Sequence, residues 1–160
     1  MPNTYPVPNE KDVFAILSML YGGEVELGSV EPVPIENKDS MVAVYINDEN
    51  EPSTACVCNY NFAAFAGSAL TKIPVGGAED AAESGDFSAM MLSNLHEVMN
   101  ICSRMFMNDS SPHVKLGTVY KTLDDAPDTV KALFGSTEER SDFTVTIPNY
   151  GDGTISFLSS

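Results

Sequence analysis

The sequence predicts an α+β fold, in which helices cover a mostly antiparallel β-sheet. Two pairs of β-rich runs, 41–46 with 54–60 and 141–148 with 154–160, are each joined by a short polar or Gly-containing segment, as in β-hairpins. A third observation is the stretch 86–107, which has helical periodicity and no internal Gly or Pro. Antiparallel hairpins outnumber the possible βαβ units, which favours α+β over a parallel α/β sheet.

The N-terminal part of the chain predicts an arm, a helix and a strand. Residues 1–8 contain three prolines and are expected to form an extended arm. Asn9 is a suitable N-cap for a helix over 10–21, because acidic residues follow it in the first turn and two glycines end the pattern. Residues 24–35 begin with alternating polar and apolar side chains and end in several prolines, and they predict one strand.

The middle of the chain predicts a central strand, two helices and a loop between them. The run 41–46 is apolar on both of its faces, which is typical of a strand inside a sheet. Residues 62–73 are rich in Ala and predict a short, closely packed helix. The acidic, Gly-rich residues 74–85 are expected to form a solvated loop before the helix at 86–107.

The C-terminal part predicts a strand, a helix and the second hairpin. The strand is expected over 113–122, and Pro127 suits the first position of a helix that Gly135 ends. In the hairpin, Gly151 and Gly153 are expected to take positive φ angles. The predicted order of elements is therefore α-β-β-β-α-α-β-α-β-β.

The composition limits the classes of partner. A chain of 160 residues suits one domain over 1–160 and is long enough to bury a sizeable core. Its formal net charge is −15, from 23 acidic and 8 basic residues. This balance argues against nucleic acid and an anionic membrane as the main partner, because too few Lys and Arg are present to neutralise phosphates. The partner surface is expected to be neutral or basic.

The sequence favours a cytoplasmic protein without a metal of its own. The N-terminus lacks the features of a signal peptide, and no apolar run approaches the roughly 20 residues that span a bilayer. Three cysteines are an odd number, which indicates reduced thiols in the core: Cys56, Cys58 and Cys102. Together with His96 and with His113 at a strand end, they do not supply four ligands at zinc spacing.

The helix at 86–107 has two faces on a wheel of about 100° per residue. One broad arc is apolar and contains Met91, Leu95, Val98, Met99, Cys102, Met105 and Phe106. The opposite arc is polar and contains Ser93, His96, Glu97, Asn100, Ser103 and Arg104. Ser93, Glu97 and Asn100 are spaced by four and then three residues, so they form one line, which we call the polar ridge. Solubility alone also explains such a face, so the pattern leaves a structural interpretation open.

The spacing on the ridge favours one type of chemistry over others. There is no pair of carboxylates for glycoside hydrolysis, and no acid is placed to orient His96 beside a nucleophilic Ser93. The chain also lacks phosphate-loop, GxSxG, HExxH and CxxC patterns. The Asn100 amide can both donate and accept hydrogen bonds, and can hold a water in line with a phosphoryl group. The Glu97 carboxylate, one helical turn away, can form an ion pair with a cationic group on a partner.

The segment LSNLHEVMNICSRMF resembles the signature helix of the CheC/CheX chemotaxis phosphatases. Their motif is Ser or Asp, three residues, Glu, two residues and Asn, which falls here on Ser93, Glu97 and Asn100. The likeness covers residues 41–159. A single copy of the motif is present in the sequence, which is more similar to CheX than to the two-site CheC.

The resemblance implies that the chain dephosphorylates a phosphorylated response regulator similar to CheY. Asn100 would enter the active site of the regulator and orient the attacking water on its aspartyl phosphate, and Glu97 would pair with its lysine. Mg²⁺ would sit on the regulator, so this chain would bind no cofactor itself. Ser93, His96 and Arg104 would contribute to binding. CheX-like proteins are often homodimers, so a homodimer is also compatible with the resemblance.

Two departures from the family pattern leave an alternative open. Arg104 lies four residues after Asn100, where the family often has a small residue, and its guanidinium can pair with Glu97 in place of a partner. A proline that is common further along the family's chain is missing. The chain can therefore be a diverged member that binds a regulator without dephosphorylating it, or an assembly component like the relatives of this fold in the flagellar motor.

Overall fold

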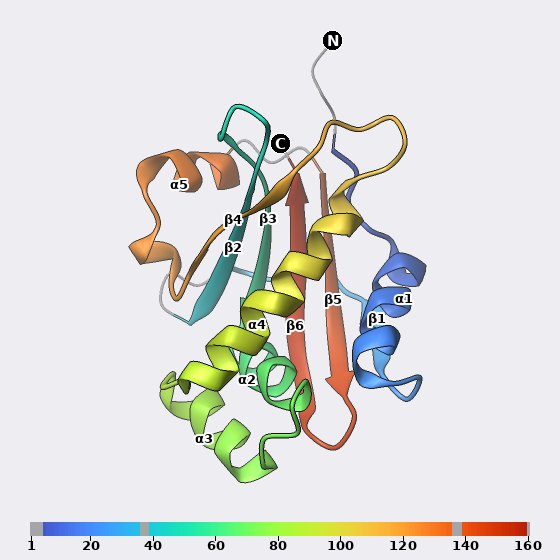
Figure 1. The fold of residues 1–160 in the computed structure, drawn as a ribbon, viewed down its shortest axis with the longest axis vertical. Helices are drawn as coiled ribbons and strands as arrows, with labels where there is room; N and C mark the ends of the chain where they lie inside the picture. Colours follow the sequence, from blue (N-terminus) through green and yellow to red (C-terminus); the bar gives the residue numbers. More distant parts are fainter. Residues whose placement is uncertain (1–4, 36–38, 136–138, 160) are drawn as a thin grey trace.

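The β-strands form one antiparallel sheet in the computed structural model, which describes residues 5–35, 39–135 and 139–159 (Figure 1). The strands are β1 (Glu26–Ser29), β2 (Ser40–Ile46), β3 (Pro52–Asn59), β4 (Lys115–Tyr120), β5 (Glu139–Ile147) and β6 (Gly151–Ser159). Their order across the sheet is β1-β5-β6-β3-β2-β4, and each neighbouring pair is antiparallel. The predicted α+β class and both predicted hairpins, β2–β3 and β5–β6, are confirmed.

Helices lie on both faces of this sheet. They are α1 (Glu10–Tyr21), α2 (Tyr60–Ala69), α3 (Val75–Ser84), α4 (Ala89–Cys102) and α5 (Asp128–Gly135), with 3₁₀ turns at Ser103–Phe106 and Leu123–Asp125. Side chains from α1, α2, α3 and α4 share the main apolar core, whereas Val130 and Leu133 of α5 pack in a smaller core. Figure 1 shows α4, in yellow, crossing the sheet diagonally.

Strand β2 supplies side chains to both cores. Met41, Ala43 and Tyr45 are buried in the main core, whereas Val42 and Val44 are buried in the core of α5. This alternation follows from the two-residue period of a strand, and it places the two cores on opposite faces of the sheet. Strand β2 also lies between β3 and β4, so the prediction of an internal strand with two apolar faces is confirmed.

The prediction of a loop over 74–85 is wrong, because these residues form helix α3. Ala78 and Ala81 are buried in the main core, and Gly85 ends the helix with a φ of 78°. Two glycines in the first turn lower the local helix propensity. Tertiary burial of the alanine face therefore decides the conformation against the local preference.

Other predicted elements form with different boundaries, and the first strand is much shorter than predicted. The strand expected over 24–35 is limited to β1, and the strand expected over 113–122 is limited to β4. Helix α2 begins before the predicted residue because Asn59 caps it, with the side-chain oxygen accepting a hydrogen bond from the backbone N–H of Phe62 at 2.9 Å. Helix α5 begins one residue after Pro127.

The described part of the predicted N-terminal arm packs on the core. Residues 5–8 have no regular secondary structure, Tyr5 is buried, and its carbonyl oxygen accepts a hydrogen bond from Ser159 Oγ at 2.9 Å. Residues 1–4 of the arm, and Ser160 at the end of the last predicted strand, lie outside the described residues. The extent of a single domain over 1–160 stays a prediction.

The glycines of the last hairpin have different roles. Gly151 has a φ of 148°, as predicted, but Asn149, with a φ of 70°, takes the left-handed conformation expected of Gly153. Gly153 instead permits a close approach between β6 and α2. A Cβ at Gly153 would lie 2.5 Å from the backbone nitrogen of Phe62, which is shorter than any real contact of this kind.

We predict that Gly153→Ala destabilises the fold, because the added methyl group collides with the backbone at the start of α2. The expected loss in the free energy of unfolding is about 1–3 kcal/mol, measured by urea denaturation. Gly28→Ala is the matched control, since it also lies in a strand and a Cβ there meets nothing within 4 Å. A Gly153→Ala variant as stable as this control would contradict the close approach.

Candidate functional site

Helix α4 presents one face to the core and the other to solvent. Ser88 caps its first turn by accepting a hydrogen bond from the backbone N–H of Met91 at 3.2 Å. The side chains of the predicted apolar arc are all buried: Met91, Leu95, Val98, Met99, Cys102, Met105 and Phe106. The wheel prediction for this face is therefore confirmed, although the helix gives way to a 3₁₀ turn after Cys102.

The predicted site residues lie on the opposite face. Ser93, His96, Glu97 and Asn100 are exposed on α4, and Arg104 is exposed in the 3₁₀ turn that follows it. With residues placed about 100° apart, these five occupy one sector roughly 100° wide. The structure therefore brings all five together along one surface, while their individual roles stay predictions.

The charged groups of this surface remain available to a partner. Among the residues that the structure describes, the ion pairs are His113 with Asp48 and Arg140 with Asp142. Neither pair involves Glu97 or Arg104, so the pairing between these two that the sequence allowed is not formed. Within the same described ranges, the side chains of Ser93 and Asn100 also form no hydrogen bond with another residue of the chain.

The backbone beneath the polar ridge is held at the point where the α-helix becomes a 3₁₀ turn. The backbone N–H of Ser103 donates to the carbonyl oxygens of Asn100 and Ile101, and Ser103 Oγ donates to the Asn100 carbonyl oxygen at 2.7 Å. The Met99 carbonyl oxygen instead accepts a hydrogen bond from the Tyr45 hydroxyl at 2.6 Å. Ser103 is buried, so its predicted place on the exposed polar arc is wrong; its hydroxyl has turned onto the backbone.

Tyr45 is a permanent donor in this arrangement. Its side chain is fully buried, and this burial, with smaller contributions from the neighbouring thiols, raises the pKa of its hydroxyl well above the ordinary value. The hydroxyl therefore stays protonated at neutral pH and can donate its hydrogen bond. It links strand β2 to the backbone immediately before Asn100.

Asn94 is a structural residue that the wheel analysis missed. It is 7% exposed, and its side-chain amide donates to the Gly67 carbonyl oxygen and to Thr71 Oγ1, both at 2.8 Å. A Cβ at Gly67 would lie 2.8 Å from the Met91 carbonyl oxygen, so α2 and α4 are in close contact here. The position of Asn94 at the edge of the apolar arc was the available signal for this role.

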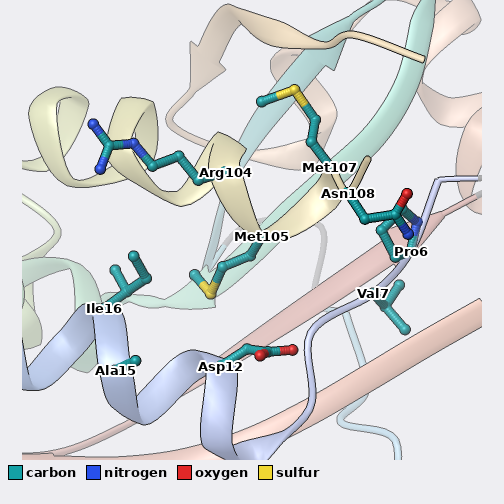
Figure 2. A pocket seen from close by; sticks show the side chains of 9 residues that line it. All are labelled: Pro6, Val7, Asp12, Ala15, Ile16, Arg104, Met105, Met107 and Asn108. Carbon is teal, nitrogen blue, oxygen red and sulfur yellow. The ribbon is translucent and has the colours of Figure 1, made fainter. Parts of the chain in front are cut away.

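A cavity of about 430 Å³ lies at the C-terminal end of the exposed surface. The N-terminal arm contributes Val7, α1 contributes Ile16, and the 3₁₀ turn contributes Met105 to its mostly apolar walls. Arg104 stands at its edge, and Figure 2 shows the Arg104 side chain extending back along α4, away from Asn108. Besides Arg104, the polar side chains in its lining are Asp12 and Asn108.

The cysteines are core thiols rather than reactive groups. Cys56, Cys58 and Cys102 are free and buried, and burial raises the pKa of Cys102 to about 12. His113 is exposed, and its Nδ1 lies 3.7 Å from Asp48 Oδ1. No group of three or more His, Cys, Asp or Glu side chains in the described ranges is placed to hold a metal ion.

In the same ranges, no helix has the length and apolar character needed to cross a membrane.

The fold is shared with chains of solved FliM and CheX–CheY structures, although no family model and no curated protein matches the chain. A chain of the FliM–SpeE complex from H. pylori has a TM-score of 0.63 at 8% identity. The match covers 93% of this chain and 80% of the chain from the complex. The FliM middle domain from H. pylori has a TM-score of 0.55 at 11% identity, with coverage of 93% and 83%.

A chain of the CheX–CheY–BeF3–Mg²⁺ complex from Borrelia burgdorferi has a TM-score of 0.53 at 13% identity and covers 90% of both chains. The resemblance to the CheC/CheX group that the motif on α4 predicts is therefore confirmed at the level of the fold. At these identities the likeness extends to the backbone and not to the chemistry of the side chains.

We predict that Tyr45→Phe destabilises the protein, because the Met99 carbonyl oxygen loses its donor while the aromatic packing is kept. The expected loss is about 1–3 kcal/mol in the free energy of unfolding, measured by urea denaturation. Tyr120→Phe serves as the control, since no hydrogen bond is formed by that hydroxyl within the described ranges. Equal stability of the two variants would show that the Tyr45 hydroxyl does not hold α4.

Proposed function

We propose that this chain docks the exposed face of α4 on a phosphorylated receiver domain similar to CheY and accelerates hydrolysis of its aspartyl phosphate. The observation that carries the proposal is the common exposure of Glu97 and Asn100, without partners in the described chain, on a buried and well-anchored helix. The fold shared with a chain of a CheX–CheY–BeF3–Mg²⁺ complex supports it.

The Asn100 amide acts by orientation. The water oxygen forms a bond to phosphorus while the bond from phosphorus to the receiver aspartate breaks, and the aspartate leaves with the electron pair as a carboxylate. Both water protons remain with the inorganic phosphate that is released. Asn100 cannot remove a proton, so it contributes by holding the water in line with the leaving carboxylate. The acyl phosphate is itself reactive, so the reaction does not need a base of this chain to take a proton from the water.

Glu97 provides the attachment that fixes this geometry. A carboxylate one helical turn from Asn100 pairs with a lysine of the receiver, and the hydrogen-bonded charge pair sets the depth to which Asn100 enters. The formal net charge of −15 favours approach to a lysine-bearing surface. The Mg²⁺ ion belongs to the receiver in this proposal. A homodimer and a cytoplasmic location stay predictions.

A second candidate function is a protein-binding or assembly module without catalysis. The FliM structures support it as an alternative, because a chain of the FliM–SpeE complex has the same fold, with a TM-score of 0.63. In this case the exposed face of α4 is a docking surface, and Glu97 matters for affinity while Asn100 has no special role.

We predict that Asn100→Ala abolishes the acceleration of phosphate loss from a phosphorylated receiver domain, with the fold unchanged. The expected decrease in the plateau rate is roughly 100-fold, because the water loses its orienting group. The measurement is the decay of phosphorylated receiver at increasing concentrations of the chain, for receiver domains of the same organism. Circular dichroism checks the fold.

Asn61→Ala is the matched control, because Asn61 is also an exposed helical asparagine but lies on α2. Its rate should equal that of the unmodified chain. Binding of a receiver without any acceleration, together with loss of affinity in Glu97→Gln, would favour the second candidate function. Absence of acceleration with every receiver domain tested would contradict the phosphatase proposal.

A further inference from the structure

Arg104 is an exposed cation at the end of the polar ridge without an ionic partner in the described chain. The sequence has 23 acidic residues and 8 basic ones, and among the Lys and Arg side chains in the described ranges only Arg140 forms an ion pair. Asp12 lines the same cavity as Arg104, and Glu97 lies on the same side of α4, yet neither forms an ion pair with it. No ion pair within the described residues therefore involves the Arg104 guanidinium.

Arg104 follows Asn100 by four residues, across the change from α4 to the 3₁₀ turn. Residues four apart in a helix lie on the same side, separated along the axis by about 6 Å. Side chains of a helix lean toward its N-terminus, and Figure 2 shows the Arg104 side chain extending back along α4. The guanidinium therefore lies on the α4 side of the 3₁₀ turn, and both Arg104 and Asn100 are exposed.

A guanidinium at this place suits the transferring phosphoryl group. It presents a planar fork of N–H donors that matches phosphate oxygens, and it keeps its charge at all relevant pH values. During hydrolysis, negative charge is spread over the three non-bridging phosphoryl oxygens while the bond to the receiver aspartate breaks. Arg104 donates hydrogen bonds to these oxygens and transfers no proton.

We infer that Arg104 is a catalytic residue that contacts the phosphoryl oxygens of the receiver's aspartyl phosphate, while Asn100 orients the water. This inference rests on the proposed phosphatase function and adds a second group to it. The two residues act on different atoms: Asn100 on the attacking water, and Arg104 on the oxygens that stay on phosphorus. Their effects on the reaction are therefore separable.

The test compares Arg104→Ala and Arg104→Lys with the unmodified chain. The expected result for Arg104→Ala is a plateau rate lowered by roughly 10- to 100-fold, with a smaller change in the concentration for half-maximal rate. Arg104→Lys should recover part of the rate, since it restores the charge without the planar fork. Lys131→Ala, on α5 at the opposite face of the sheet, is the control for the loss of one positive charge and should leave the rate unchanged.

A binding experiment gives a readout that does not depend on turnover. Affinities are measured for one receiver domain with Mg²⁺, both with and without beryllium trifluoride, which mimics the phosphoryl group. If Arg104 touches the phosphoryl oxygens, Arg104→Ala should reduce the preference for the loaded receiver by roughly fivefold or more. An equal loss of affinity for both forms would show that Arg104 is only a docking contact, and would overturn the inference.

The failure of this inference differs from the failure of the proposed function. An unchanged plateau rate in Arg104→Ala, beside a large loss in Asn100→Ala, overturns the role of Arg104 and leaves the phosphatase function standing. If the unmodified chain accelerates no dephosphorylation, the proposed function fails. A preference for the loaded receiver that depends on Arg104 would then still support contact with the phosphoryl group, and its absence would overturn that contact as well.

Discussion

The burial of one side of α4 is the constraint on which the rest of the molecule depends. Apolar side chains alone allow a helix to roll by small amounts, but α4 is also held by directional contacts. The Tyr45 hydroxyl bonds the Met99 carbonyl oxygen, and the Asn94 amide bonds the Gly67 carbonyl oxygen of α2. Gly67 lets the two helix backbones approach closely. These contacts fix the rotation of α4 about its axis and its distance from the sheet. The direction in which the polar ridge points is therefore fixed too.

This anchoring matters for a reaction that depends on position. A group that orients water must be held to a fraction of an ångström, which a packed helix provides more readily than a loop. The carbonyl oxygen of Asn100 accepts hydrogen bonds from both the backbone N–H and the hydroxyl of Ser103. The change to a 3₁₀ turn thereby frees the preceding carbonyl for Tyr45. The helix end and the sheet thus hold the same short piece of backbone from two sides.

The sequence was sufficient wherever periodicity carries the information. The apolar arc of α4, the two faces of β2 and both hairpins follow from residue spacing, and the structure confirms them. It was insufficient where a contact with residues distant in the chain decides the local conformation. Helix α3 forms in spite of its two glycines, because its alanines are buried. The Ser103 hydroxyl donates a hydrogen bond to the backbone of the preceding helix instead of facing solvent. Gly153 is required by Phe62, which lies far away in the chain, so no local pattern could reveal it.

The fold itself does not choose between catalysis and assembly, since solved structures of FliM and of a CheX–CheY complex both share it at 8–13% identity. The choice must come from side chains that the fold does not require. Core packing explains Leu95 and Tyr45, but it does not require Glu97 and Asn100 on the exposed face of α4 or Arg104 in the 3₁₀ turn that follows. A docking surface needs complementary charge and area, and tolerates many arrangements of them. Under the proposed function, a carboxylate, an amide and a guanidinium on one surface would supply the attachment, the oriented water and the phosphoryl contact that hydrolysis needs, and this is the ground on which we propose catalysis rather than assembly.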